Sequence, residues 1–166
     1  MNIKRCISHS DFSLAIRITR DYMDWLNMDL GFQDIEKELE RFSFMYGHPN
    51  GIFLLAWDNS ELVGGVGFRL FQPTVCEMKR LFVYDRYKGG GVGRSLCEAL
   101  ISEAKDQGYE KMRLDTLDRL TAATALYRSL GFREIGPYRY NPDPTTIYME
   151  LDLKTIETQK RFHPFQ

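Results

Sequence analysis

Residues 75–95 read VCEMKRLFVYDRYKGGGVGRS, and this stretch decides the fold class. The run from Val75 to Tyr84 is rich in β-branched and aromatic residues, which predicts a long strand. The run Lys88–Ser95 predicts a glycine turn and the start of a helix that reaches about Gln107. A strand, a glycine-rich turn and a helix in this order are typical of an anion-binding loop. Free backbone N–H groups and the helix dipole attract phosphate there.

The spacing of this loop excludes two common phosphate-binding motifs. The phosphate-loop NTPase pattern requires its first glycine at Lys88 and a lysine at Arg94. The dinucleotide pattern, started at Gly89 or Gly91, places its last glycine on Arg94 or Leu96. The sequence therefore leaves two readings, a phosphate-bearing ligand held by another type of glycine loop, with Lys88 and Arg94 as flanking cations, or a plain flexible turn.

The regions on either side alternate between helical and strand periodicities. We expect strands over 3–7, 52–57, 62–71, 112–115, 133–140 and 145–153, and helices from Asp11 to Leu26, Gln33 to Met45 and Ala122 to Leu130. Ser8 or Ser10 is the expected N-cap of the first helix. In the second helix the charged residues Glu36, Lys37, Glu38, Glu40 and Arg41 are expected to face mostly outward. This order predicts an α/β protein with a central mixed sheet and helices on both faces.

Composition limits the partners. The chain has 166 residues, 43% hydrophobic and 27% charged, with a formal net charge of −1. This balance does not favour a nucleic-acid partner. No 18-residue apolar run or leader peptide is visible, so we expect no membrane partner and a cytoplasmic location. Three dispersed cysteines and three dispersed histidines predict neither a disulfide framework nor a metal site.

Two segments resemble motifs of the GNAT acetyltransferases. Glu77-Met78-Lys79-Arg80-Leu81-Phe82-Val83, followed by Lys88-Gly89-Gly90-Gly91-Val92-Gly93, is similar to the family's motif A. Ala125-Leu126-Tyr127-Arg128-Ser129-Leu130-Gly131-Phe132 is similar to its second conserved helix. The resemblance implies a GNAT domain over residues 1–153, with a polar tail over 154–166. It also implies acetyl-CoA as cosubstrate.

The resemblance assigns roles to particular residues. It implies that the backbone of Leu81, Phe82 and Val83 pairs with the pantetheine arm of coenzyme A. It implies that the pyrophosphate is held by Lys88, Gly89, Gly90, Gly91, Val92, Gly93, Arg94 and Ser95. Lys88 stands where the family usually has Arg or Gln, which keeps the charge but loses the planar fork.

The chemistry of amide formation defines the catalytic candidates. The amine has to lose a proton, the thioester carbonyl has to be polarised, and the leaving thiolate has to be stabilised or protonated. The resemblance implies that Tyr127 lies near the sulfur of coenzyme A and Glu77 on the active-site strand, which makes Tyr127 the candidate acid and Glu77 the candidate base, either directly or through a water. Their alternatives are a core aromatic for Tyr127 and an ion pair with Lys79 or Arg80 for Glu77.

The predicted reaction is direct transfer of an acetyl group from acetyl-CoA to a primary amine of a small molecule or peptide. Tyr22, Trp25, Phe32, Gln33 and Glu36 are candidates for the acceptor side, or else core aromatics and a solvated acidic face. The alternative function is a module that senses acyl-CoA without turnover. The sequence leaves the acceptor and the formation of a homodimer open.

Overall fold

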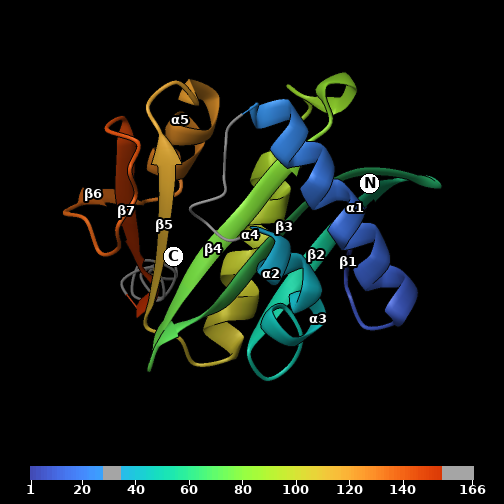
Figure 1. Cartoon of the computed structure of the whole chain (residues 1–166), viewed down its shortest axis with the longest axis horizontal. Helices are drawn as coiled ribbons and strands as arrows, with labels where there is room; N and C mark the ends of the chain where they lie inside the picture. Colours follow the sequence, from blue (N-terminus) through green and yellow to red (C-terminus); the bar gives the residue numbers. More distant parts are fainter. Residues whose placement is uncertain (28–34, 155–166) are drawn as a thin grey trace, which may run out of the picture. The chain divides into compact units, whose positions relative to one another are not determined.

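The computed structural model describes residues 1–27 and 35–154. The order of the elements follows the α/β pattern expected from the sequence (Figure 1). The strands are β1 (Asn2–Arg5), β2 (Gly51–Asp58), β3 (Glu61–Gln72), β4 (Val75–Val83), β5 (Lys111–Leu117), β6 (Arg133–Ile135) and β7 (Thr146–Asp152). The helices are α1 (His9–Leu26), α2 (Ile35–Glu40), α3 (Phe42–Met45), α4 (Val92–Asp106) and α5 (Thr121–Ser129), with a 3-10 turn over Asp85–Tyr87.

The strands form a mixed sheet in the order β1-β2-β3-β4-β5-β7-β6. Contacts divide the chain into two compact units, which are described separately. The first unit holds residues 1–70 and 78–100, and the second holds residues 71–77 and those from 101 onward. Strand β4 therefore begins in the second unit and ends in the first.

Helices cover both faces of the sheet in the first unit, and the glycines of β3 make this close packing feasible. A Cβ atom at Gly64 would lie 3.1 Å from Leu96 of α4, whereas one at Gly65 would lie 3.5 Å from Ile18 of α1. Successive strand residues point to opposite faces, so α1 and α4 lie on opposite sides of β3. The sequence prediction of helices on both faces is confirmed for this unit.

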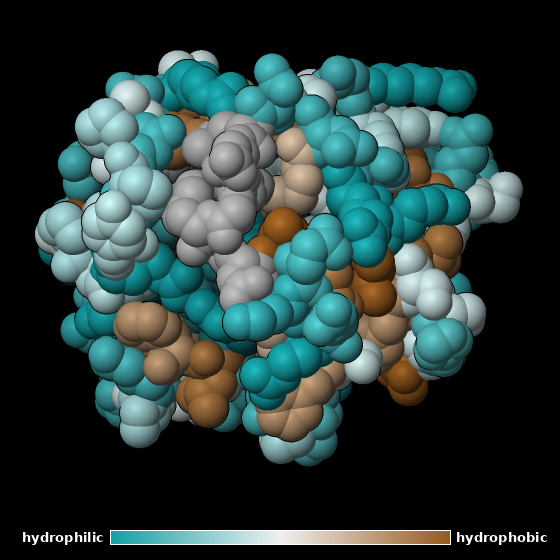
Figure 2. All heavy atoms as spheres, viewed as in Figure 1, coloured by the Kyte–Doolittle hydropathy of each residue, from teal (hydrophilic) through white to brown (hydrophobic). Residues whose placement is uncertain are grey.

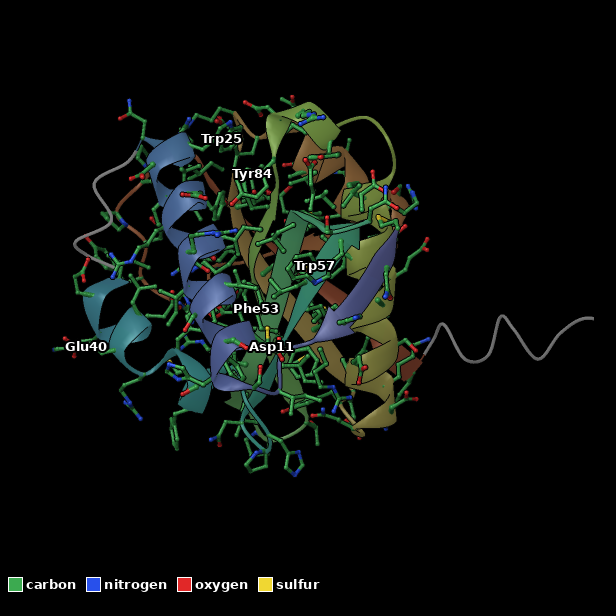
Figure 3. All side chains as sticks on the ribbon, turned by 90° about the vertical axis from the view of Figure 1, so that its right-hand side faces the viewer. Asp11, Trp25, Glu40, Phe53, Trp57 and Tyr84 are labelled. Atoms are coloured by element: carbon green, nitrogen blue, oxygen red, sulfur yellow. The ribbon has the colours of Figure 1, made fainter. Side chains whose placement is uncertain are left out.

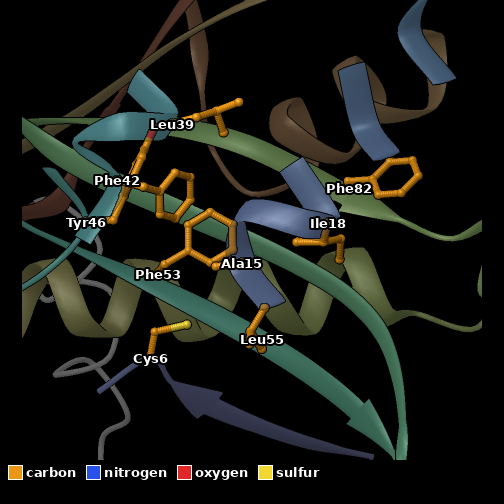
Figure 4. Packing of buried hydrophobic residues seen from close by; sticks show 9 residues of the cluster. All are labelled: Cys6, Ala15, Ile18, Leu39, Phe42, Tyr46, Phe53, Leu55 and Phe82. Carbon is orange, nitrogen blue, oxygen red and sulfur yellow. The ribbon is translucent and has the colours of Figure 1, made fainter. Parts of the chain in front are cut away.

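Aromatic side chains fill the core on the α1 side of the first unit. Phe42, Tyr46 and Phe53 are fully buried, and their ring centroids are 4.5–5.5 Å apart (Figure 4). Such offset and tilted pairs combine apolar burial with favourable ring electrostatics. Figure 4 shows the rest of this cluster, namely Cys6, Ala15, Ile18, Leu39, Leu55 and Phe82.

The second unit is built on β5. The first residues of β4 pair with it in parallel, from Val75↔Lys111 to Glu77↔Arg113. On its other edge β5 pairs antiparallel with β7 from Lys111↔Asp152 to Leu117↔Thr146, and β7 pairs with β6. Helix α5 follows β5 and ends before Gly131, whose φ of +101° is a conformation that glycine adopts readily.

Three sequence predictions about the elements were wrong. The helix expected over 33–45 is two short helices separated at Arg41, whose backbone leaves the helical range at φ −106° and ψ 15°. Gln33, the first residue of that expected helix, lies outside the described residues. The strand expected to reach Tyr140 ends at Ile135, because Gly136 and Pro137 follow and proline has no N–H for a ladder. Glu38, expected among the mostly outward residues, is buried.

The surface drawn in Figure 2 shows hydrophobic residues in small separate groups among hydrophilic ones. Large exposed apolar side chains come from different elements, among them Ile7, Trp25, Phe44 and Leu70. No helix within the described part of the chain has both the length and the apolarity needed to cross a membrane.

Candidate active site

The glycine loop adopts the backbone that its sequence predicts. Gly89 and Gly91 both have a φ of +83°, and α4 begins at Val92 directly after them. A Cβ atom at either glycine would meet no atom within 4 Å. These glycines are therefore explained by their left-handed backbone and not by crowding. The loop leads directly into a 15-residue helix, whose first N–H groups have no partner within the helix.

The first cation of this loop is already in contact with other side chains. The Lys88 ammonium forms an ion pair with Asp85 and lies 4.0 Å from the centre of the Trp25 ring. Trp25, near the end of α1 (Figure 3), is 42% exposed, and its ring centroid lies 6.0 Å from that of Phe82. The Tyr84 hydroxyl donates a hydrogen bond to the carboxylate of Asp21. Burial and this carboxylate raise the pKa of Tyr84 to about 12, so the phenol is protonated at neutral pH.

The end of β4 offers backbone groups on one edge. The N–H of Tyr84 donates to the carbonyl of Val63, and a Cβ atom at Gly64 would lie 2.9 Å from the carbonyl oxygen of Phe82. Phe82 and Tyr84 therefore direct their backbone groups toward β3. Because these directions alternate along a strand, Leu81 and Val83 direct their N–H and C=O groups to the opposite edge.

Arg80 interrupts the regular geometry of β4 immediately before Leu81. Its φ is +64°, which is unfavourable for a residue with a Cβ atom. The sequence predicted one long strand from Val75 to Tyr84, and no periodicity signal indicates such a residue within it.

Glu77 is fully buried, and its two oxygens have different partners. The Tyr138 hydroxyl donates to Oε2 at 2.8 Å, and Nη2 of Arg139 contacts Oε1 at 2.8 Å. Burial and the Glu77 charge raise the pKa of Tyr138 well above its usual range. The ion-pair partners expected from the sequence were Lys79 or Arg80. The structure places Arg139 on Glu77 and pairs Arg80 with Glu38 instead.

Tyr127 lies on α5 in the second unit, where it is 7% exposed. Its ring packs against Phe132, with the centroids 5.8 Å apart. The helix ends two residues later, and the N–H of Phe132 returns to the carbonyl of Tyr127. The carbonyl of Tyr127 therefore belongs to the hydrogen-bonded turn that ends α5.

The cysteine beside Glu77 is not prepared for nucleophilic attack. Burial raises the pKa of the Cys76 thiol to about 12, and the neighbouring Glu77 charge acts in the same direction. A thiol with this pKa is protonated at neutral pH, and the thiolate is the nucleophilic form. This supports direct transfer over a thioester intermediate on the protein.

Sequence reasoning missed the residues that hold the two buried carboxylates. Tyr138 and Arg139 lie in a loop where the sequence predicted a strand, and no spacing rule links them to Glu77. Glu38 could have been found, because it lies three residues after Ile35 and four before Phe42 and so shares their face of a helix.

Of the acceptor-side candidates, Phe32 and Gln33 lie outside the described residues, and Glu36 forms an exposed ion pair with Arg20.

Comparisons with known proteins identify the family of this chain and agree with its fold. Residues 19–132 match the model of the acetyltransferase (GNAT) family. The chain is 39% identical over 145 residues to an uncharacterised N-acetyltransferase of Schizosaccharomyces pombe. The aligned region covers 86% of this chain and 87% of the relative. A GNAT acetyltransferase of Staphylococcus aureus superposes with a TM-score of 0.75 at 23% identity, covering 92% and 99% of the two chains. The PaiA N-acetyltransferase of Thermoplasma acidophilum, solved with coenzyme A, superposes with a TM-score of 0.69 at 20% identity, over 92% and 99%.

Proposed function

Since the chain belongs to the GNAT acetyltransferase family and is an N-acetyltransferase that uses acetyl-CoA, we propose that it acetylates the primary amine of a small molecule or peptide by direct transfer. The pyrophosphate of the cosubstrate is proposed to bind at Lys88–Ser95. The observation that carries this assignment is the pair of left-handed glycines before α4, with open space at the positions of their missing side chains.

The pantetheine arm is proposed to pair with Leu81 and Val83. Their N–H and C=O groups point away from β3, so an extended amide chain could add to this edge as a strand does. In this arrangement Phe82 contributes packing, since its backbone faces β3 and its ring belongs to the core cluster. The N–H of Leu81 is the proposed donor to the thioester carbonyl.

The proposed reaction moves two protons. The amine nitrogen attacks the carbonyl carbon, the C–S bond breaks, and Tyr127 protonates the departing thiolate. The amine proton passes to Glu77. Because Glu77 is fully buried, this proton has to travel over a partner, and we assign that step to Tyr138. The Tyr138 oxygen takes the amine proton while its own proton moves to Glu77 Oε2.

We place the enzyme in the cytoplasm. The three cysteines, Cys6, Cys76 and Cys97, are free thiols, and they are all buried. Free thiols persist in a reducing compartment, which supports this location.

Release of free thiol from acetyl-CoA, measured across amines, amino acids, polyamines and peptides, tests the proposed function. We expect turnover above the hydrolysis control with at least one class of acceptor and a product with an added acetyl group on nitrogen. Tight binding of coenzyme A without product across the panel would instead support a sensor of acyl-CoA.

A further inference from the structure

Arg80, the left-handed residue of β4, forms a buried ion pair with Glu38. Both Nε and Nη2 of Arg80 lie 2.9 Å from Oε2 of Glu38, and the two side chains are only 7% and 6% exposed. The hydroxyl of Tyr46 donates to the other oxygen of Glu38 at 3.0 Å. Tyr46 itself is fully buried and packs against Phe42 and Phe53 in the aromatic core (Figure 4).

Stability alone is a weak explanation for these three polar groups. Removing a carboxylate and a guanidinium from water carries a large desolvation cost, and apolar residues of similar size often stabilise a core as well. Burial acts to lower the pKa of the Arg80 guanidinium, but Glu38, Tyr46 and Tyr22 together outweigh burial and raise this pKa. Arg80 therefore stays charged, and its two contacts with Glu38 hold the guanidinium in one position.

The backbone of Arg80 requires this kind of restraint. Arginine has no local side-chain interaction that favours a φ of +64°, and such a conformation persists only where surrounding contacts impose it. The contact comes from Glu38 of α2, 42 residues away in the sequence, and Tyr46 in turn holds the other oxygen of Glu38. Rotation at Arg80 sets the orientation of the peptide groups on both sides of it, and the following one carries the N–H of Leu81.

We propose that Glu38 and Tyr46 are positioning residues for acetyl transfer. By holding the Arg80 guanidinium they fix the left-handed backbone at Arg80, and this aims the N–H of Leu81 at the thioester carbonyl. The inference rests on the proposed function, because the proposed function makes the N–H of Leu81 the donor to the thioester carbonyl. It adds two residues that contact neither the acyl group nor coenzyme A.

The test begins with Glu38→Ala, which removes the carboxylate that contacts the Arg80 guanidinium. We expect kcat to fall at least about tenfold, as for loss of an oxyanion donor. The KM for acetyl-CoA and the calorimetric Kd for coenzyme A should stay within about threefold, because the glycine loop and Val83 are unchanged. Glu40→Ala removes an exposed carboxylate from the same helix and should leave all three values at wild type.

A rescue variant separates positioning from packing. Glycine adopts a positive φ without a steric penalty, so Glu38→Ala combined with Arg80→Gly should recover kcat at least about fivefold over Glu38→Ala alone. A crystal structure of Glu38→Ala should show residue 80 with a negative φ. If Glu38→Ala does not fold, Glu38→Gln and Tyr46→Phe replace it, with kcat expected to fall while the Kd for coenzyme A is kept.

Several outcomes would overturn the inference. These are an unchanged kcat in Glu38→Ala, equal losses in kcat and in affinity for coenzyme A, no recovery in the double variant, or a φ at residue 80 that stays positive. A wild-type enzyme without turnover on any amine would overturn the proposed function itself, which is a different result from a loss confined to the variants.

Discussion

At the scale of single residues, removing the hydroxyl of Tyr127 tests whether this residue acts as an acid or only packs in the core. If this phenol protonates the thiolate, Tyr127→Phe should lower kcat by about 10²–10⁴, the range of general acid catalysis, and keep most of the affinity for coenzyme A. If the ring only packs against Phe132, kcat should stay near wild type and unfolding should shift by about 1 kcal/mol. Steady-state kinetics with thermal unfolding measures both.

The matched control is Tyr109→Phe, which removes a half-buried hydroxyl in the same unit at a site with no proposed role. A small loss of kcat in Tyr127→Phe that equals the control would leave the enzyme assignment intact and remove Tyr127 as its acid.

The role of Glu77 is tested by the pH dependence of the rate. A base matters most where the acceptor amine is protonated, so Glu77→Gln should lower turnover mainly at low pH. Tyr138→Phe should give the same change in the profile if its hydroxyl carries the proton. Glu134→Gln, an exposed carboxylate of the same unit, serves as control. A profile that superimposes on wild type would leave Glu77 as an anchor for Arg139.

The sequence predicted which residues are candidates here but not what holds them. Glu77 and Tyr127 stand at fixed positions in recognisable motifs, so their numbers follow from spacing. Tyr138 and Arg139 lie 61 and 62 residues after Glu77 in an irregular loop. Their contact with Glu77 depends on how that loop folds back, which no local pattern encodes.

At the scale of elements, the start of α1 shows a signal that was readable from sequence. Ser8 is the N-cap, and Asp11 completes a capping box by accepting from the N–H of Ser8. Ser8→Ala should lower the free energy of unfolding by about 1 kcal/mol, since it removes the acceptor for the N–H of Asp11. Urea unfolding measures this. Ser13→Ala, within the exposed face of the same helix, should not destabilise.

The glycine loop tests whether backbone conformation governs cosubstrate binding. Gly91→Val should weaken binding of coenzyme A at least about tenfold, because a β-branched residue strongly disfavours a φ of +83°. Gly91→Asn should weaken it less, since asparagine tolerates this region better. Calorimetry with coenzyme A gives the values, and Gly136→Ala, also in open space, is the control. Equal affinities in all four proteins would contradict the phosphate-loop assignment.

Elements with strong periodicity and clear end signals were predictable, and weaker ones were not. The glycine turn, α4 and α5 appear where the sequence places them, and left-handed glycines lie before α4 and after both helices. The helix expected over 33–45 is interrupted at Arg41 by packing that places Phe42 and Tyr46 in the core. Glu38 becomes buried in the same region because it has Arg80 as a partner.

At the scale of the whole molecule, the family resemblance supplied what local patterns lack. Alternating strands and helices predicted a mixed sheet, but its strand order, with β7 between β5 and β6, depends on long-range pairing. The left-handed residue within β4 is likewise set by distant contacts from Glu38 and not by its neighbours. Residues that carry chemistry were therefore easier to identify than residues that position them.

The pH range of stability follows from which groups titrate differently on folding. Asp11 has a lowered pKa because it accepts from the N–H groups of Ile7 and Ser8. The pKa of Glu150 is lowered, against the effect of burial, by a hydrogen bond from Arg113. A lowered carboxyl pKa adds stability above its unfolded value of about 4, and this is lost as pH falls. A raised tyrosine pKa, as for Tyr46 and Tyr138, adds stability below its unfolded value of about 10.

We therefore expect the melting temperature to be nearly constant between about pH 5 and 8 and to fall on both sides. The alkaline fall arises because the unfolded chain releases thiol protons above about pH 8.5 and phenolic protons above about pH 10, while the buried cysteines and tyrosines retain theirs. Tyr46→Phe removes one such group, so its melting temperature should decrease less between pH 8 and 11 than that of wild type. Tyr140→Phe, whose side chain is 85% exposed, should decrease as wild type does. If the melting temperatures of all three proteins decrease equally between pH 8 and 11, burial of Tyr46 does not contribute to the alkaline loss of stability. Its hydroxyl would then reach water before the chain unfolds.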